Sequence, residues 1–238
     1  MDWQDDGVVL ALRPHGESAA IIEVFTAAHG RHPGVVRGGG SRRMAATLQP
    51  GSQVQVAWRA RLEEHLGVFS VEPVRARAGV LADRRALDGL NAVCALLRLG
   101  LPERAPHAAL WRATVDLLDG LEAGADWPLT YLQWEVLLLE ELGFGLDLTV
   151  CAVTGTDSDL AYVSPRSGRA VSRAAAGDWA GRLLPLPVCL SGGAVTPDGL
   201  AQGLAITGHF LARGLAPVLH DGLLPVARGR LVARLGRP

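Results

Sequence analysis

The feature that most constrains this sequence is a change in the spacing of its apolar residues near residue 80. Before that point, apolar residues alternate with polar ones or form short β-branched runs, which is typical of strands. Five strands are expected there, over residues 7–14, 19–26, 35–37, 52–62 and 66–74. Beyond it the apolar residues recur at helical spacing, so we expect a β domain followed by helices.

Five helices are expected in the second part, over residues 83–101, 105–124, 128–145, 196–215 and 223–236. Residues 151–193 are rich in Gly, Ser and Pro and are expected to form an irregular or small-β insertion. The fold class is therefore α+β: a small N-terminal β-barrel, of the OB type among other small β folds, followed by a mostly α-helical domain. The expected domains are residues 1–80, 81–150, 151–193 and 194–238.

The strand expected at 52–62 has the clearest two-residue alternation. It places Trp58 and Leu62 on the core face and turns Arg59 and Arg61 outward. By contrast, the segment GGGSRR at 38–43 has the composition of a flexible basic loop. Residues 27–34 are also expected to be a loop.

All 23 basic residues are Arg, and the chain contains no Lys. A phosphate-binding P-loop, a protein-kinase core and Schiff-base chemistry all need a Lys, so these classes are excluded. The charges are also segregated: residues 7–62 hold seven Arg and two acids, 86–150 three Arg and ten acids, and 151–238 nine Arg and five acids. The basic parts suggest a polyanion partner, but charge alone favours the alternative that such blocks merely solvate a surface.

The basic β region provides the candidate DNA-binding residues, because guanidinium groups donate paired hydrogen bonds to phosphate and stack on bases. These candidates are Arg13, Arg37, Arg42, Arg43, Arg59 and Arg61. Few aromatic residues are left to stack on bases, since Phe25, Trp58 and Phe69 are candidates for the core. Binding is therefore expected to rely on phosphate contacts and to depend on salt.

The sequence shows no assembled catalytic or metal site. His15, His29 and His32 fall near expected loops and are interpreted as mainly solvated, whereas His209 lies in an apolar helical run and is expected in the core. The three Cys lie far apart, which argues against disulfides and zinc, and Cys94 is interpreted as a small apolar residue. Neighbouring Glu140 and Glu141 point about 100° apart on a helix and cannot form an acid–base pair.

Several segments, read in order, resemble the bacterial RecO family of recombination mediators. They are VVLALRPHGESAAIIEVFTAAHGRHPGVVRGGGSRR (8–43), TLQPGSQVQVAWRAR with LGVFSVEP (47–73), LQWEVLLLEELGFGLDLTVCAVTG (132–155), YVSPRSGRAVSRAAAG (162–177) and LLPVAR (223–228). No single motif is diagnostic, but their order and spacing extend over nearly the whole chain.

The resemblance implies an N-terminal OB-fold, a helical C-terminal domain and a zinc-finger-like insertion at 151–193. Some members bind zinc there through four Cys. In this sequence Cys151 occupies the first position, but Thr154 stands at its partner position, and the second pair region, YVSPRSGR, has no Cys. We therefore expect a degenerate module without metal, in which side-chain packing replaces the ion, and no cofactor.

The resemblance also implies a function in DNA repair and recombination, in the RecF pathway. It implies binding of single- and double-stranded DNA, annealing of complementary strands, and loading of RecA together with RecR. A further implied partner is the acidic C-terminal tail of single-stranded-DNA-binding protein. Such a tail needs an apolar cleft with an arginine rim, for which the candidates are Arg98, Arg104 and Arg112 with Trp111. Ordinary surface ion pairs are the alternative for these residues.

A non-enzymatic mediator is thus the leading hypothesis. The alternatives are a protein–protein adaptor without direct DNA binding, and a hydrolase that uses the loop His and Ser residues. The acidic start MDWQDD does not fit an export signal, and no apolar run is long enough to cross a membrane, so residence in the cytoplasm at the nucleoid is expected.

Overall fold

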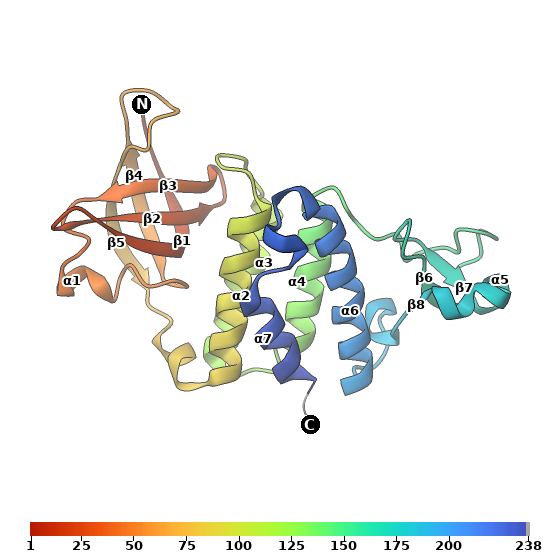
Figure 1. Cartoon of the computed structure of the whole chain (residues 1–238). Coiled ribbons are helices and arrows are strands. Elements are labelled where there is room, and N and C mark those ends of the chain that lie inside the picture. The colour runs from red at the N-terminus through yellow and green to blue at the C-terminus, as the bar shows by residue number, and fades with distance from the viewer. Residues whose placement is uncertain (237–238) are drawn as a thin grey trace. The chain divides into compact units, whose positions relative to one another are not determined.

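The computed structural model of the chain describes residues 1–236. It divides into two compact units, Met1–Ala125 and a second that begins at Asp126 (Figure 1). The elements of the first unit are β1 (Asp2–His15), β2 (Ala19–Thr26), β3 (Gly30–Val36), α1 (Arg42–Ala45), β4 (Gln53–Arg59), β5 (Val68–Arg75), the 3-10 turn η1 (Ala78–Ala82), α2 (Arg84–Gly100) and α3 (Ala108–Ala123). A five-stranded sheet followed by helices is confirmed.

The five strands form a closed barrel with the order β1-β2-β3-β5-β4, because β4 pairs with β1. Alternate side chains point inward and fill the barrel. Its buried core consists of Val9, Ile22, Val24, Val36, Leu48, Val54, Val56, Trp58 and Phe69. Trp58 therefore lies in the core and Arg59 outside it, as the alternation predicts.

Strand β1 is longer than expected, because it begins at Asp2 rather than residue 7. Its N-terminal half pairs with β4 from Asp2↔Arg59 to Val8↔Gln53, and its C-terminal half pairs with β2. Polar residues in this stretch hid the strand from a reading based on apolar runs. Backbone pairing with β4 along this stretch compensates for the low strand propensity of Asp.

Strand β3 corrects a second expectation. It runs over seven residues that pair with β2, where the sequence predicted a loop at 27–34 and a short strand at 35–37. Pro33 hid it, yet β3 pairs with β5 only at Val35 and Val36, so Pro33 leaves no ladder donor missing on that side. Consequently His32, expected to be solvated, is 2% exposed.

Two further expectations in this region were wrong. The basic glycine segment is not a continuous loop, since Arg42–Ala45 form the short helix α1. Strand β4 ends at Arg59, and Leu62 therefore leaves the core face and is 45% exposed.

Helices α2 and α3 pack beside the barrel within the first unit and match the predicted helices closely. Cys94 on α2 is buried, and burial raises the pKa of its thiol to about 12, consistent with a small apolar residue. The α2–α3 loop covers one end of β3: a Cβ at Gly30, whose φ is +63°, would lie 1.9 Å from the carbonyl oxygen of Ala105. Only glycine permits that approach.

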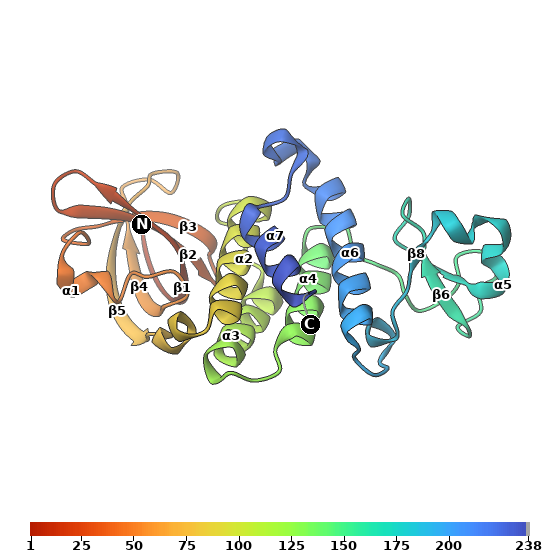
Figure 2. The ribbon, with the colours of Figure 1, turned by 60° about the horizontal axis from the view of Figure 1, so that its bottom comes forward.

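The second unit contains three longer helices and a small sheet (Figure 2). Its elements are α4 (Pro128–Glu141), β6 (Leu160–Val163), β7 (Ala170–Ser172), α5 (Arg173–Ala176), η2 (Gly177–Arg182), β8 (Leu184–Pro185), η3 (Val188–Ser191), α6 (Pro197–Gly214), η4 (Ala216–Val218), η5 (His220–Gly222) and α7 (Val226–Leu235). The strand order β7-β6-β8 makes residues 151–193 the small-β form of the expected insertion.

Helix α6 begins as predicted, with Thr196 Oγ1 accepting a hydrogen bond from the Gly199 N–H at 3.0 Å. Helix α4 ends at Glu141 rather than at 145, because Gly143 adopts a left-handed φ of +80° that interrupts the helix. His209 on α6 is exposed and not part of the core. Its Nε2 lies 2.9 Å from the Pro165 carbonyl oxygen.

Candidate nucleic-acid interface

The six arginines predicted to bind DNA all lie on the barrel or its loops. Arg13 is on β1, Arg37 follows β3, and Arg42 and Arg43 form the first turn of α1. Arg59 ends β4 and Arg61 follows it. All six are exposed, and among residues 1–236 none of them has an ion-pair or side-chain hydrogen-bond partner. Their guanidinium groups are therefore available to an external anion.

Other arginines of the first unit are used internally. The ion pairs, at N···O distances of 2.6–3.5 Å, join Arg31 to Glu23 and Glu103, Arg75 to Asp119 and Glu122, Arg77 to Asp119, and Arg98 to Glu23. Glu23 illustrates the electrostatics: the guanidinium groups of Arg98 and Arg31 hold the pKa of its carboxyl below the usual value despite the opposing effect of burial. The fold thus separates arginines that hold the unit together from those left open.

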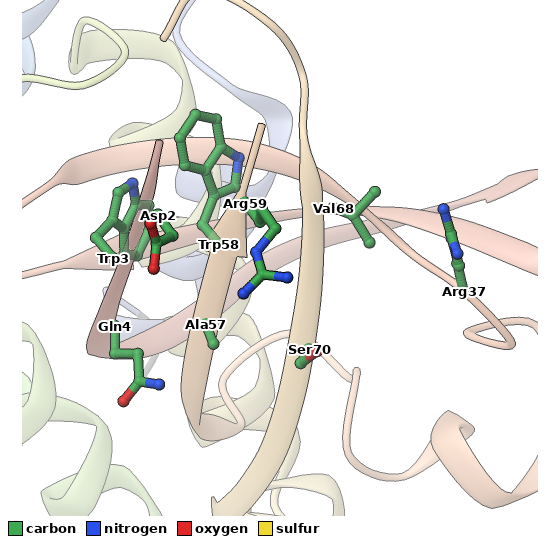
Figure 3. Close-up of a pocket in the computed structure, with 9 residues that line it drawn as sticks. All are labelled: Asp2, Trp3, Gln4, Arg37, Ala57, Trp58, Arg59, Val68 and Ser70. Carbon is green, nitrogen blue, oxygen red and sulfur yellow. The ribbon is translucent and has the colours of Figure 1, made fainter. Parts of the chain in front are cut away.

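Two of the open arginines share a groove on the barrel (Figure 3). The groove has a volume of about 400 Å³ and lies across β1, β4 and β5. It is lined by Asp2, Trp3, Gln4, Arg37, Ala57, Trp58, Arg59, Val68 and Ser70. We call it the β1–β4–β5 groove.

The groove brings in Trp3, an aromatic residue that sequence reasoning missed. Trp3 is half-buried and stacks on the His29 ring with centroids 3.9 Å apart and planes 6° apart. It also lies 5.8 Å from the Trp58 ring and 5.2 Å from the His32 ring. Trp3 is the one large apolar residue of DWQDDG, so no local alternation marks it as part of a strand, and only the pairing with β4 places it there.

His29 and His32 line a second cavity of about 400 Å³, whereas His15 does not. His29 Nδ1 lies 3.2 Å from an Asp5 carboxylate oxygen, and His32 Nε2 accepts a hydrogen bond from Arg104 Nε at 3.3 Å. The residues lining this cavity are Met1, Asp2, Trp3, Ala28, His29, His32, Trp58, Glu63 and Arg104, without a Ser, Thr or Cys. The lining of this cavity therefore lacks the nucleophile that the hydrolase hypothesis requires beside the His rings, and the nearby Thr26 hydroxyl accepts from the His29 backbone N–H at 3.1 Å.

The four residues predicted to bind a partner tail lie on α2, α3 and the loop between them. Arg98 pairs with Glu23, Arg104 donates to His32 and to the His65 carbonyl, and Trp111 Nε1 donates to the Phe25 carbonyl at 3.2 Å. Arg112 is exposed. In three of the four residues, side-chain N–H groups therefore already donate hydrogen bonds to the barrel of the same unit.

Comparison with known proteins then identifies the family. The model described as "Recombination protein O N terminal" matches residues 1–77, and the one described as "Recombination protein O C terminal" matches residues 81–220. The chain belongs to the RecO family.

Curated relatives cover the chain from end to end. A protein of Cereibacter sphaeroides is 60% identical over 238 residues, covering 100% of this chain and 99% of its own. Proteins of Ruegeria sp. and Dinoroseobacter shibae are 56% and 53% identical, with the same coverage. All three are named "DNA repair protein RecO". This chain is therefore a RecO-family DNA repair protein, which agrees with the predicted role in repair and recombination.

In this RecO-family chain the insertion is built around Cys151. The Cys151 sulfur accepts a hydrogen bond from the Ser172 N–H at 3.3 Å, and the side chain packs with Val171 and Ala176. Leu160 and Tyr162 pack against this cluster. Within residues 1–236, no group of three or more His, Cys, Asp and Glu side chains is arranged to hold a metal ion.

The second unit also has a cavity of about 300 Å³ beside α6. Phe144, Phe210, Arg166 and Arg213 are among the residues that line it. Arg213 donates to the Pro165 carbonyl oxygen at 3.1 Å, whereas Arg166 is exposed. A cavity that combines aromatic and arginine side chains, the chemistry expected of a tail-binding site, therefore exists outside the predicted set of residues.

A buried ion pair lies among the helices of the second unit. Arg228 of α7 donates to both carboxylate oxygens of Glu135 of α4 at 2.7 and 2.8 Å, and to the Leu204 carbonyl of α6 at 2.8 Å. Tyr131 and Thr207 also donate to Glu135. Sequence reasoning placed Arg228 on an amphipathic helix but did not find its partner.

No helix of residues 1–236 is long and apolar enough to cross a membrane.

Proposed function

We propose that this chain is a recombination mediator that binds single- and double-stranded DNA through its barrel, without an enzymatic step of its own. The observation that carries this proposal is the set of six exposed arginines with no acidic partner in the part of the chain that the structure describes. Arginines that are paired with acids would bind phosphate less well, because each would first have to break its ion pair with a carboxylate. The closed barrel with order β1-β2-β3-β5-β4 supports an OB-type assignment.

Annealing follows from the same chemistry. Guanidinium groups that neutralise phosphates reduce the repulsion between two complementary strands, and contacts to the backbone leave base edges free to pair. In this proposal the chain anneals strands and, together with RecR, helps to load RecA onto DNA covered by single-stranded-DNA-binding protein. Membership of the RecO family supports these steps.

We further propose that residues 151–193 are a zinc-finger-like insertion without its metal ligands, between helical segments 81–150 and 194–238, with residues 1–80 as the DNA-binding domain. The packing of Cys151 with Val171 and Ala176 supports the view that side chains hold this module together.

The test is a salt series of fluorescence anisotropy with a labelled oligonucleotide. We expect Arg37→Ala, Arg42→Ala and Arg43→Ala together to weaken binding and to reduce the slope of log K against log salt by about 0.7–0.9 per lost phosphate contact. The rate of annealing of complementary oligonucleotides should fall with the affinity.

A matched control removes acid-paired charges from the same unit. Arg75→Ala with Arg98→Ala takes away exposed guanidinium groups that already pair with Asp119, Glu122 and Glu23. This control should leave the salt slope near that of the wild-type protein. An unchanged slope in the triple variant would place the DNA site elsewhere, and a wild-type protein that binds no DNA would favour the adaptor alternative.

A further inference from the structure

The β1–β4–β5 groove is shaped by two rows of cross-strand neighbours. Asp2, Arg59 and Val68 are paired across the three strands, and so are Gln4, Ala57 and Ser70. Residues two apart on a strand share a face, so all six side chains lie on the outer face of the barrel. The small side chains of Ala57 and Ser70 leave a hollow floor between larger neighbours.

Charge and aromatic groups are placed around this floor. Arg59 lies within the groove, Arg37 lies beyond β5 on the far side, and Trp3 is at the opposite side (Figure 3). Neither arginine has an ion-pair partner among residues 1–236. Asp2 is the one acid among the residues that line the groove. Two cationic groups therefore flank a polar hollow, while the rings of Trp3 and Trp58 pack on the core side of the same strands.

The outer face of β2 and β3, the usual binding face of an OB barrel, is partly occupied in this chain. Glu23 of β2 and Arg31 of β3 are joined to each other and to α2 and the α2–α3 loop: Arg98 pairs with Glu23, and Arg31 Nε donates to the Leu101 carbonyl at 3.0 Å. The Arg104 N–H donates to the Arg31 carbonyl at 2.9 Å. The β1–β4–β5 face carries no such cover within the first unit.

We propose that the β1–β4–β5 groove holds one unstacked nucleotide of a single strand. The flanking phosphates bind Arg37 and Arg59, the base lies over Ala57 and Ser70, and the Gln4 amide and Ser70 hydroxyl face the base edge. This inference rests on the proposed DNA-binding function and adds a base-binding subsite to it. A volume of about 400 Å³ is in the range of small-ligand sites. Paired bases in a duplex are stacked and cannot enter, so the groove selects single strands.

The experiment uses the full chain and two oligonucleotides of equal length, oligothymidylate and an abasic strand with the same phosphates. Wild-type protein should bind the abasic strand more weakly, by about 5-fold to 100-fold, because one base–protein contact is lost at each groove. Two variants fill the groove without changing charge, Ala57→Leu and Ser70→Leu. Each should lower the affinity for oligothymidylate by a larger factor than the affinity for the abasic strand, so that the preference between the two strands falls.

Gln55→Leu is the matched control, because Gln55 is exposed on the same strand but does not line the groove. It should retain the wild-type preference for oligothymidylate, and far-UV circular dichroism checks that all three variants fold. Equal wild-type affinity for the two strands, or an undiminished preference in both filling variants, would overturn the groove proposal and leave phosphate binding standing. Absence of binding to either strand would overturn the DNA-binding function itself.

Discussion

Whether an arginine of this protein can bind an external anion depends on the residues that surround its guanidinium group. Arg77 is 5% exposed and donates to Asp119, the Gly51 carbonyl and the Gln53 amide oxygen, so its charge is fully used inside the first unit. Arg37 and Arg59 carry the same charge and are open to solvent. Sequence distance does not separate these cases, because the acids that pair with Arg77 and Arg98 lie 42 and 75 residues away.

At the scale of a single residue, His32 predicts how the stability of the first unit depends on pH. Burial lowers the pKa of His32, and the charge of Arg104 adds to this effect, although a hydrogen bond to the Pro33 carbonyl and the charge of Glu103 oppose it. A lowered pKa means that the folded state holds the ring neutral. Its stabilising contribution is therefore complete above the ordinary value of 6.5 and is lost as the pH falls below it, through the folded-state pKa.

We expect the urea midpoint of the first unit to decrease as the pH is lowered from about 7 to about 5. His32→Phe should flatten part of this decrease, since each unit of pKa difference corresponds to about 1.4 kcal/mol. His15→Gln, at an exposed position, should keep the wild-type profile. A His32→Phe profile as steep as that of the wild type would show that other groups titrate.

At the scale of elements, the buried Glu135–Arg228 pair connects α4, α6 and α7. Glu135 is 0% and Arg228 7% exposed, and the hydrogen bonds from Tyr131 and Thr207 complete the carboxylate's partners. A buried pair of this kind stabilises little relative to apolar packing, but removing one member leaves an isolated buried charge. It therefore specifies which helices pack together more than it adds to stability.

Arg228→Ala should destabilise the second unit by about 3–5 kcal/mol, because Glu135 loses its counter-charge. Combining Arg228→Met with Glu135→Gln removes both charges. The Gln oxygen can still accept from Tyr131, and its NH2 group can donate to the Thr207 hydroxyl, so this double variant should be more stable than Arg228→Ala. Urea unfolding followed by circular dichroism measures both. A double variant as unstable as the single one would mean that the lost contacts of Arg228, and not the orphaned carboxylate, dominate.

At the scale of the whole molecule, the two units carry chemically different surfaces. The first carries the open arginines, and the second carries the cavity with Phe144, Phe210, Arg166 and Arg213. An acidic tail that ends in an aromatic residue could use the predicted set around Arg98 and Arg112 or this cavity. Arg98 and Arg104 already bind partners in their own unit, whereas Arg166 is exposed and has no ion pair among residues 1–236. The cavity beside Arg166 therefore has the better matched chemistry.

The prediction is that Phe144→Ala with Arg166→Gln weakens binding of a labelled acidic peptide with a C-terminal Phe by at least about tenfold, which corresponds to about 1.4 kcal/mol. Arg98→Gln with Arg112→Gln removes one charge more and should have a smaller effect. Peptide anisotropy on the full chain measures both affinities. The opposite ranking would place the tail on α2 and α3, as the sequence predicted.

Much of the fold was predictable, because strand and helix periods are local properties of the chain. Helices α2, α3, α4, α6 and α7 and strands β2, β4 and β5 lie where the apolar spacing placed them. The N-terminal half of β1 and most of β3 were missed because acids and Pro33 weaken the local signal, and pairing with distant strands outweighs it.

The sequence by itself determined that a β domain is followed by helices, that chemistry requiring Lys is absent, and that six basic residues lie on a small β domain. Only the tertiary structure decided which arginines are open and that Trp3, Arg37 and Arg59 share one groove. It also decided that Arg228 is neutralised by Glu135, 93 residues away in the chain. The physical reason is that charge pairing and cavity shape depend on neighbours brought together by folding, whereas secondary structure follows largely from residues adjacent in the chain.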